Sequence, residues 1–184
     1  MREVKASVIQ CDEIWSFTYA KQKNVHHAKD APEFAGDTWT WAAIDSDSKL
    51  IVSYMVGGRD SGYAIEFMDD LRARLANRVQ LTTDGHKAYL EAVERQNLTM
   101  RMHMRQFTRL TNGFSKKVEN HAYAVALHFM YYNFVRVHQT LKVTPAMEAG
   151  LTDRLWDIAD LVELIDANEE APKKRGPYKK RISK

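Results

Sequence analysis

Two aspartates occupy positions from which they could act together on a phosphate group. Asp12 lies inside residues 7–20, a segment rich in β-branched and aromatic residues, and Asp84 directly follows the short run 79–83. A carboxylate inside an apolar strand is costly unless it is paired or bound to a metal. Hard divalent cations such as Mg²⁺ prefer carboxylate oxygens and keep several waters, so they can join protein to phosphate. The two aspartates are therefore candidate metal ligands.

A third acid would complete a site for two metal ions. Two ions roughly 3.5–4 Å apart can activate an attacking oxygen and stabilise a leaving one in a phosphodiester displacement, and holding them takes several carboxylates. Glu94 follows Asp84 by ten positions, and Glu119 follows it by 35. A purely structural explanation is also open, in which Asp12 pairs with a basic neighbour and Asp84 caps the next helix.

The elements that must position these acids can be predicted from pattern and turn chemistry. The pattern predicts a strand over residues 7–20, a loop over 21–36 and a hairpin with strands at 38–44 and 50–56. A helix over residues 64–75 and a fourth strand over 79–83 should follow. Strand side chains alternate, so Asp12 and Glu13 should point to opposite faces. The order predicts three antiparallel strands followed by a helical crossover into a fourth.

A basic segment follows Glu94. Residues 94–117 hold six Lys or Arg and no further acid, and Arg101, Arg105 and Arg109 recur every four residues. On a helix they would form one stripe suited to a phosphate backbone, to which Lys116 and Lys117 would add. A solvated helical face is the alternative explanation of the same charges.

Three helices are predicted in the carboxyl-terminal part. Residues 118–141 are apolar almost all round, which favours a helix buried by the rest of the domain. Residues 144–150 predict a short helix capped by Thr144, begun by Pro145 and ended by Gly150. An amphipathic helix is predicted over residues 153–166. The basic residues after it predict a disordered tail.

Taken together, these segments resemble the catalytic domain of DDE transposases of the insertion-sequence-one type. The resemblance rests on "IQCDEIWSF", "WTWAAIDSDSKLIVSYMVGGRDSGYA", "VQLTTDGHKAY" and the long stretch from "VERQN" to "TPAMEAG", and it covers nearly the whole chain before the basic tail. It implies an α/β fold with a ribonuclease-H-like mixed sheet of about four strands and carboxyl-terminal helices. It also implies DNA as the substrate and two Mg²⁺ or Mn²⁺ ions.

The resemblance assigns roles to individual residues. The catalytic and metal-binding acids would be Asp12, Asp84 and Glu94, and the basic residue usual seven positions after the glutamate is present as Arg101. Ala126 stands at the corresponding position after Glu119, which favours Glu94 as the third acid.

The chain also departs from the family pattern. The family's amino-terminal DNA-reading region has no counterpart before residue 7, so we expect a truncation there. The helix, strand and loops usual between the second and third acids are missing, which indicates a deletion between Val93 and Glu94. A helix from His86 to Glu94 would carry the glutamate more than about 10 Å along its axis, away from Asp84. The function expected is DNA cleavage and strand transfer; the alternative is a non-catalytic DNA-binding remnant.

Length and composition predict one domain and a soluble chain. With 184 residues, 45% of them hydrophobic and 28% charged, we expect one domain over residues 1–165 and a basic tail over 166–184. The single cysteine excludes an intrachain disulfide, and no stretch is long and apolar enough for a membrane span. We therefore expect a cytoplasmic, nucleoid-associated protein, a homo-oligomer when active, with no membrane and no small-molecule cofactor.

Overall fold

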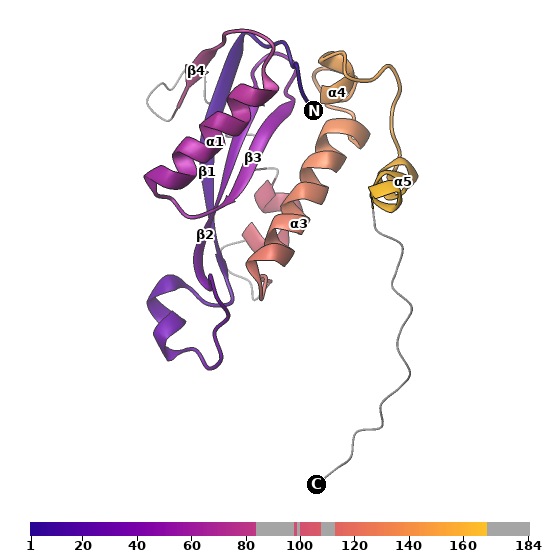
Figure 1. The fold of residues 1–184 in the computed structure, drawn as a ribbon. Coiled ribbons are helices and arrows are strands. Elements are labelled where there is room, and N and C mark those ends of the chain that lie inside the picture. The colour runs from indigo at the N-terminus through magenta and orange to yellow at the C-terminus, as the bar shows by residue number, and fades with distance from the viewer. Residues whose placement is uncertain (84–97, 99, 108–112, 169–184) are drawn as a thin grey trace.

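The computed structural model describes residues 1–83, 98, 100–107 and 113–168. Its centre is a four-stranded mixed sheet in the order β3-β2-β1-β4 (Figure 1). The strands are β1 (Val8–Thr18), β2 (Gly36–Asp45), β3 (Ile51–Gly57) and β4 (Gln80–Thr82). β1 is antiparallel to β2, which is antiparallel to β3, whereas β4 runs parallel to β1. The predicted hairpin and the crossover into a fourth strand are confirmed.

The crossover is made by α1 (Ser61–Arg74), which packs on one face of the sheet. Its N-cap is Asp60, whose side chain accepts hydrogen bonds from the backbone N–H groups of Gly62 and Tyr63. Asp70 joins the helix to β3 because it accepts a hydrogen bond from Ser53 Oγ. The chain then reaches β4 beside β1, on the far side from β2, as Figure 1 shows.

Side chains that alternate along the strands pack into two separate hydrophobic cores, one on each face of the sheet. On one face, Ile14, Ala42 and Ile44 contact residues of α3 and of the segment 100–107. On the other face, Cys11, Ala43 and Val52 contact α1 and the region of α4. A sheet covered on both sides leaves few places where a carboxylate can reach water, which restricts where a site can form.

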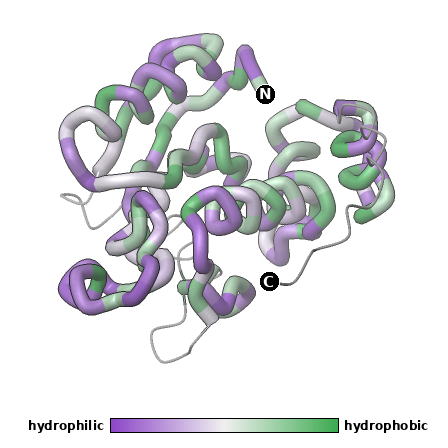
Figure 2. Tube along the Cα trace, turned by 60° about the horizontal axis from the view of Figure 1, so that its bottom comes forward, coloured by the Kyte–Doolittle hydropathy of each residue, from purple (hydrophilic) through white to green (hydrophobic). Residues whose placement is uncertain are grey.

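The carboxyl-terminal part is helical: α3 (Val118–Met130), the π-helix η3 (Tyr131–Val135), α4 (Pro145–Glu148) and α5 (Ile158–Asn168). The side chain of Asn133 in η3 holds this part to the sheet, since its amide makes two hydrogen bonds to the backbone of Ile51, at 3.0 and 2.9 Å. The short helix α4 has the predicted cap, because Thr144 Oγ1 accepts from the backbone N–H of Met147. In Figure 2 hydrophobic and hydrophilic residues alternate along the helical coils.

Several predicted boundaries were wrong. The apolar segment expected to form one buried helix through residue 141 leaves helical geometry after Val135, and its Tyr123 is 70% exposed. The expected loop after β1 contains a 3₁₀ helix, η1 (Gln22–His27). The last helix begins at Ile158, five residues later than predicted, and the tail beyond it lies outside the described residues.

Candidate functional site

Asp12 lies in the middle of β1 and is half-buried. Side chains of a strand alternate, so Asp12 shares the face of Gln10 and Ile14, the face covered by α3. Its Oδ1 accepts a hydrogen bond of 2.8 Å from the backbone N–H of Glu13, which fixes the carboxylate relative to the strand.

A cavity of about 470 Å³ opens beside this part of β1. Its walls come from β1, β2, the start of α1 and the residue after β4: Cys11, Asp12, Glu13, Trp41, Arg59, Ala64, Phe67, Met68 and Thr83. Thr83 is the last described residue before Asp84. The end of β4 and Asp12 therefore line one cavity.

The pairing of β1 with β4 explains why the cavity forms there. The parallel register joins Val8 to Gln80, Ile9 to Leu81 and Gln10 to Thr82, and it ends at that point. Beyond Gln10, β1 pairs with no described strand on that side. Asp84 stands two residues after Thr82, as Asp12 stands two residues after Gln10.

Glu13 lines the same cavity but is engaged by a cation. It contacts Arg59 in a long ion pair of 3.8 Å between Oε2 and Nη2. Arg59 lies just before α1 and stacks over the ring of Trp39, 4.5 Å from its centroid. The prediction that Asp12 and Glu13 point to opposite faces agrees with these contacts, because Glu13 is held on the side of α1.

Cys11, next to Asp12, is not a nucleophile. Burial raises the pKa of its thiol to about 12, and the neighbouring charges of Glu13 and Asp12 add to the effect. The thiol therefore stays protonated near neutral pH, and its side chain packs in the core under α1.

The remaining predicted acids are not brought to Asp12 by the described residues. Asp84 and Glu94 lie outside those residues. Glu119 lies in the first turn of α3 and is exposed. Within the described ranges, no group of three or more His, Cys, Asp or Glu side chains is placed to hold a metal ion.

The predicted arginine stripe does not form one continuous helix. Residues 100–103 are helical, the helix breaks at Met104, and Arg105 begins the short 3₁₀ helix η2 (Arg105–Phe107). Arg101, Arg105, Lys116 and Lys117 are exposed, and Arg109 lies outside the described residues. The helical spacing that predicted a stripe was therefore wrong for its second member, because Arg105 lies beyond the break in the helix.

Sequence reasoning missed a buried polar contact between α3 and β1. His121 is fully buried, and its Nε2 lies 3.1 Å from Ser16 Oγ. Ser16 Oγ donates its proton to the backbone carbonyl of Thr38, so the His121 Nε2 must be the donor in their contact. Burial lowers the pKa of His121 to about 4, so the ring is neutral and structural. A lone histidine in an apolar stretch is too weak a pattern to have predicted it.

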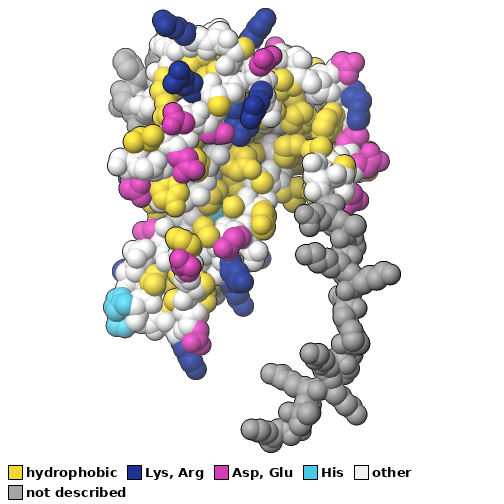
Figure 3. Space-filling view, viewed as in Figure 1, with side chains coloured by type: hydrophobic (Ala, Val, Ile, Leu, Met, Phe, Trp, Pro, Cys, Tyr) yellow, Lys and Arg dark blue, Asp and Glu magenta, His cyan; other side chains and the backbone are white. Residues whose placement is uncertain are grey.

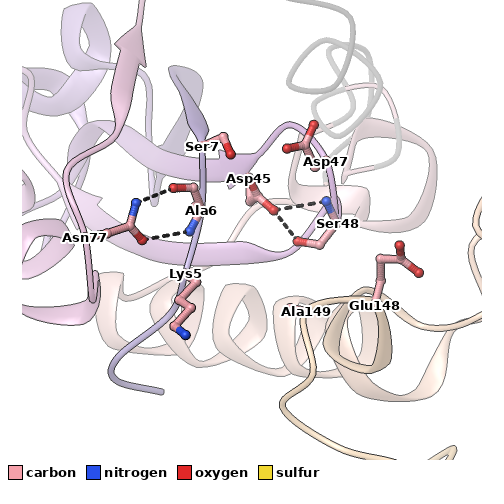
Figure 4. A pocket seen from close by; sticks show the side chains of 9 residues that line it. All are labelled: Lys5, Ala6, Ser7, Asp45, Asp47, Ser48, Asn77, Glu148 and Ala149. Carbon is pink, nitrogen blue, oxygen red and sulfur yellow. Dashed lines mark hydrogen bonds between the residues drawn. The ribbon is translucent and has the colours of Figure 1, made fainter.

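A second polar cavity, of about 410 Å³, lies at the other end of β1 (Figure 4). Asp45 uses one carboxylate oxygen to accept hydrogen bonds from the backbone and the hydroxyl of Ser48. Asn77 makes two hydrogen bonds to the backbone of Ala6. These contacts close the β2–β3 turn and fasten the chain after α1 to the start of β1, so they position the sheet.

No known family model matches the sequence, and no curated protein matches it with significance. In the described part of the chain, no helix is long and apolar enough to cross a membrane.

Proposed function

We propose that this chain is the catalytic domain of a DDE-type DNA transposase with a ribonuclease-H-like fold, similar to the insertion-sequence-one type. The observation that carries the proposal is the parallel register of β1 and β4, which stops two residues short of Asp12 on one strand and two residues short of Asp84 on the other. Neighbouring parallel strands advance at the same rate, so the equal spacing beyond the last pair would place the two aspartates at the same level of the sheet.

The strand order supports the same proposal. A ribonuclease-H-like sheet begins with three antiparallel strands and places the fourth beside the first by a helical crossover, and the order β3-β2-β1-β4 has this form. Many unrelated activities share common folds, so the order alone does not decide function. The placement of an acid in the middle of the central strand adds the chemical argument.

The donor set suits a hard cation. Asp12 offers carboxylate oxygens at a half-buried position in the middle of β1, two residues beyond the last residue of β1 that pairs with β4. Asp12, Asp84 and Glu94 would hold Mg²⁺ or Mn²⁺. Metal ions held there supply activation of a water or a 3′-hydroxyl and stabilisation of the leaving oxygen.

The chain's own residues would bind and orient the DNA. The hydrogen bond from the Glu13 backbone fixes the Asp12 carboxylate, so the strand sets the direction in which it points. The exposed cations Arg101, Arg105, Lys116 and Lys117 would contact phosphates. Such contacts carry no sequence information, so they position DNA without selecting an element end.

Calorimetric titration with Mn²⁺ tests the metal site. Asp12→Asn should weaken binding roughly 10-fold or more, because loss of an outer-shell partner alone typically costs 10–100-fold. Glu13→Gln is the matched control: it removes the adjacent carboxylate, which is engaged with Arg59, and should leave Mn²⁺ affinity nearly unchanged. Equal effects of the two substitutions would remove Asp12 from the proposed site.

A non-catalytic DNA-binding remnant is the second candidate. The observation that favours it is the spacing of only ten residues between Asp84 and Glu94, which is short for a chain that must return to the same metal ions. Nicking of supercoiled plasmid with Mg²⁺ separates the candidates. Turnover abolished by Glu94→Gln supports the enzyme. A remnant would bind the plasmid without nicking it, and a helix, strand and loop inserted between Val93 and Glu94 should then restore nicking.

A further inference from the structure

An aromatic surface lies beside the Asp12 cavity and has no role in the folding core. Trp15 and Trp39 are direct cross-strand partners in β1 and β2, and both are half-buried. In the described part of the chain, neither belongs to the two core clusters, whereas Trp41 and Trp156 both pack against the second. We call Trp15, Trp39 and their two stacked cations, Lys21 and Arg59, the tryptophan platform.

The platform lies where the paired strands β1 and β2 extend beyond the start of α1. Trp39 pairs with Gly57, the last residue of β3, and α1 begins only at Ser61. The helix covers Trp41, through Phe67, and its Tyr63 lies against Gly57 and Gly58 at this end of the sheet. Figure 3 shows hydrophobic side chains with basic and acidic ones beside them on this lower part of the molecule.

A cation lies over each tryptophan ring. The guanidinium of Arg59 is 4.5 Å from the ring centroid of Trp39, and Lys21 Nζ is 5.9 Å from that of Trp15. The loop that carries Arg59 is fixed on both sides, because Trp41 Nε1 donates to the Gly58 carbonyl and Asp60 caps α1. The platform is therefore built before any ligand binds.

The donors of Arg59 are available, unlike those of the other stacked arginine. Its side chain is 54% exposed and, among the described residues, has only the 3.8 Å ion pair with Glu13 as a polar contact. Arg154 also stacks on a tryptophan, but two hydrogen bonds of 2.9 and 2.6 Å commit it to Asp160. A planar cation held on an indole with unused N–H groups suits a phosphate, and its flat face suits a nucleobase.

We propose that the tryptophan platform binds unpaired nucleotides of single-stranded DNA next to the Asp12 cavity. A base would stack on the Trp15 indole or on the Arg59–Trp39 pair, while Lys21 and Arg59 contact the flanking phosphates. In a duplex the base faces are already stacked, so this surface selects unpaired strands. The choice of DNA rather than RNA rests on the proposed function. The stacking surface itself is argued only from the positions of the two tryptophans and their cations.

The test is fluorescence anisotropy of the full chain in EDTA with a 5′-fluorescein-labelled (dT)₁₂ and, separately, a labelled 12-base-pair duplex. Trp39→Leu should weaken (dT)₁₂ binding by about 5- to 150-fold, the range for the loss of one base stack, and duplex binding by less than about twofold. Arg59→Gln should weaken (dT)₁₂ binding in the same direction and leaves the indole in place, so it tests the platform even if Trp39→Leu is unstable.

Arg154→Gln is the control, because it removes a stacked arginine whose donors are committed elsewhere, and it should change neither affinity. Failure of the wild-type chain to bind (dT)₁₂, or equal losses on (dT)₁₂ and duplex for the platform variants, would overturn the inference. Tighter binding of (rU)₁₂ than of (dT)₁₂ would overturn the assignment to DNA. Because no metal is present, these results are independent of whether Asp12 binds Mn²⁺.

Discussion

Acidification should destabilise the fold through His121. Its ring is fully buried between β1 and α3, with Nε2 3.1 Å from Ser16 Oγ and the Phe107 ring 5.1 Å away between centroids. Burial lowers its pKa from 6.5 to about 4 because the charged form cannot be hydrated there. In the unfolded chain the same ring takes up a proton at the ordinary pKa.

The size of the effect follows from linkage. A depressed histidine pKa means that the unfolded state binds more protons, so stability is complete above pH 6.5 and is lost as the pH falls toward 4. Between pH 7 and pH 5 the loss from His121 alone is about 2 kcal/mol in the free energy of unfolding. His128, whose pKa is also lowered to about 4, contributes in the same direction.

Urea unfolding of wild type and His121→Gln at a series of pH values measures this loss. The variant should be less stable at pH 7, because it removes a buried contact, but its stability should fall by about 2 kcal/mol less between pH 7 and pH 5. His27→Gln, at an exposed position on η1, should keep the wild-type slope. Parallel pH curves for wild type and His121→Gln would refute the assignment.

Further predictions concern Asn133, Thr144 and the separation of the two proposed sites. Asn133→Ala should lower the free energy of unfolding by about 2–4 kcal/mol, because two buried backbone groups of Ile51 lose their partners. Thr144→Ala should cost about 1 kcal/mol through loss of the α4 cap. Asp12→Asn should leave (dT)₁₂ affinity in EDTA within about twofold, and Trp39→Leu should leave Mn²⁺ affinity nearly unchanged, since alternation directs Asp12 and the tryptophans to opposite faces. Denaturant titration, anisotropy and calorimetry measure these effects.

The amino-terminal half of the fold could be predicted from the sequence because its signals are local. β2 and β3 flank a turn of Asp, Ser and Lys residues, and α1 shows helical spacing after a capping Asp60. The side-by-side position of β1 and β4 needed the expectation of a known sheet order, since no local pattern states which strands pair. The structure confirms that pairing.

The helical half was predicted less well because tertiary contacts decide where its helices end. Residues 118–141 are apolar throughout, so nothing in the pattern marks an end at Val135. Just before the helical segment ends, the side chain of Asn133 makes hydrogen bonds to the backbone of Ile51, 82 residues earlier in the chain. This long-range contact cannot be read from the local pattern. The prediction of an arginine stripe was wrong for a similar reason. Met104 and Phe107 are buried in the core, three residues apart. That spacing matches a 3₁₀ turn, in which the Phe107 N–H donates to the Met104 carbonyl, rather than a continuing α-helix.

The candidate site depends on the shortness of β4 as much as on the acids. On one side β1 pairs with β2 over most of its length, whereas on the other side it pairs with only the three residues of β4. The pairing stops at Gln10, and Asp12 and Thr83 both line the cavity near the carboxyl end of β4. Ligands of open α/β sheets bind outside the carboxyl ends of strands, where the chain diverges, and this cavity occupies such a position.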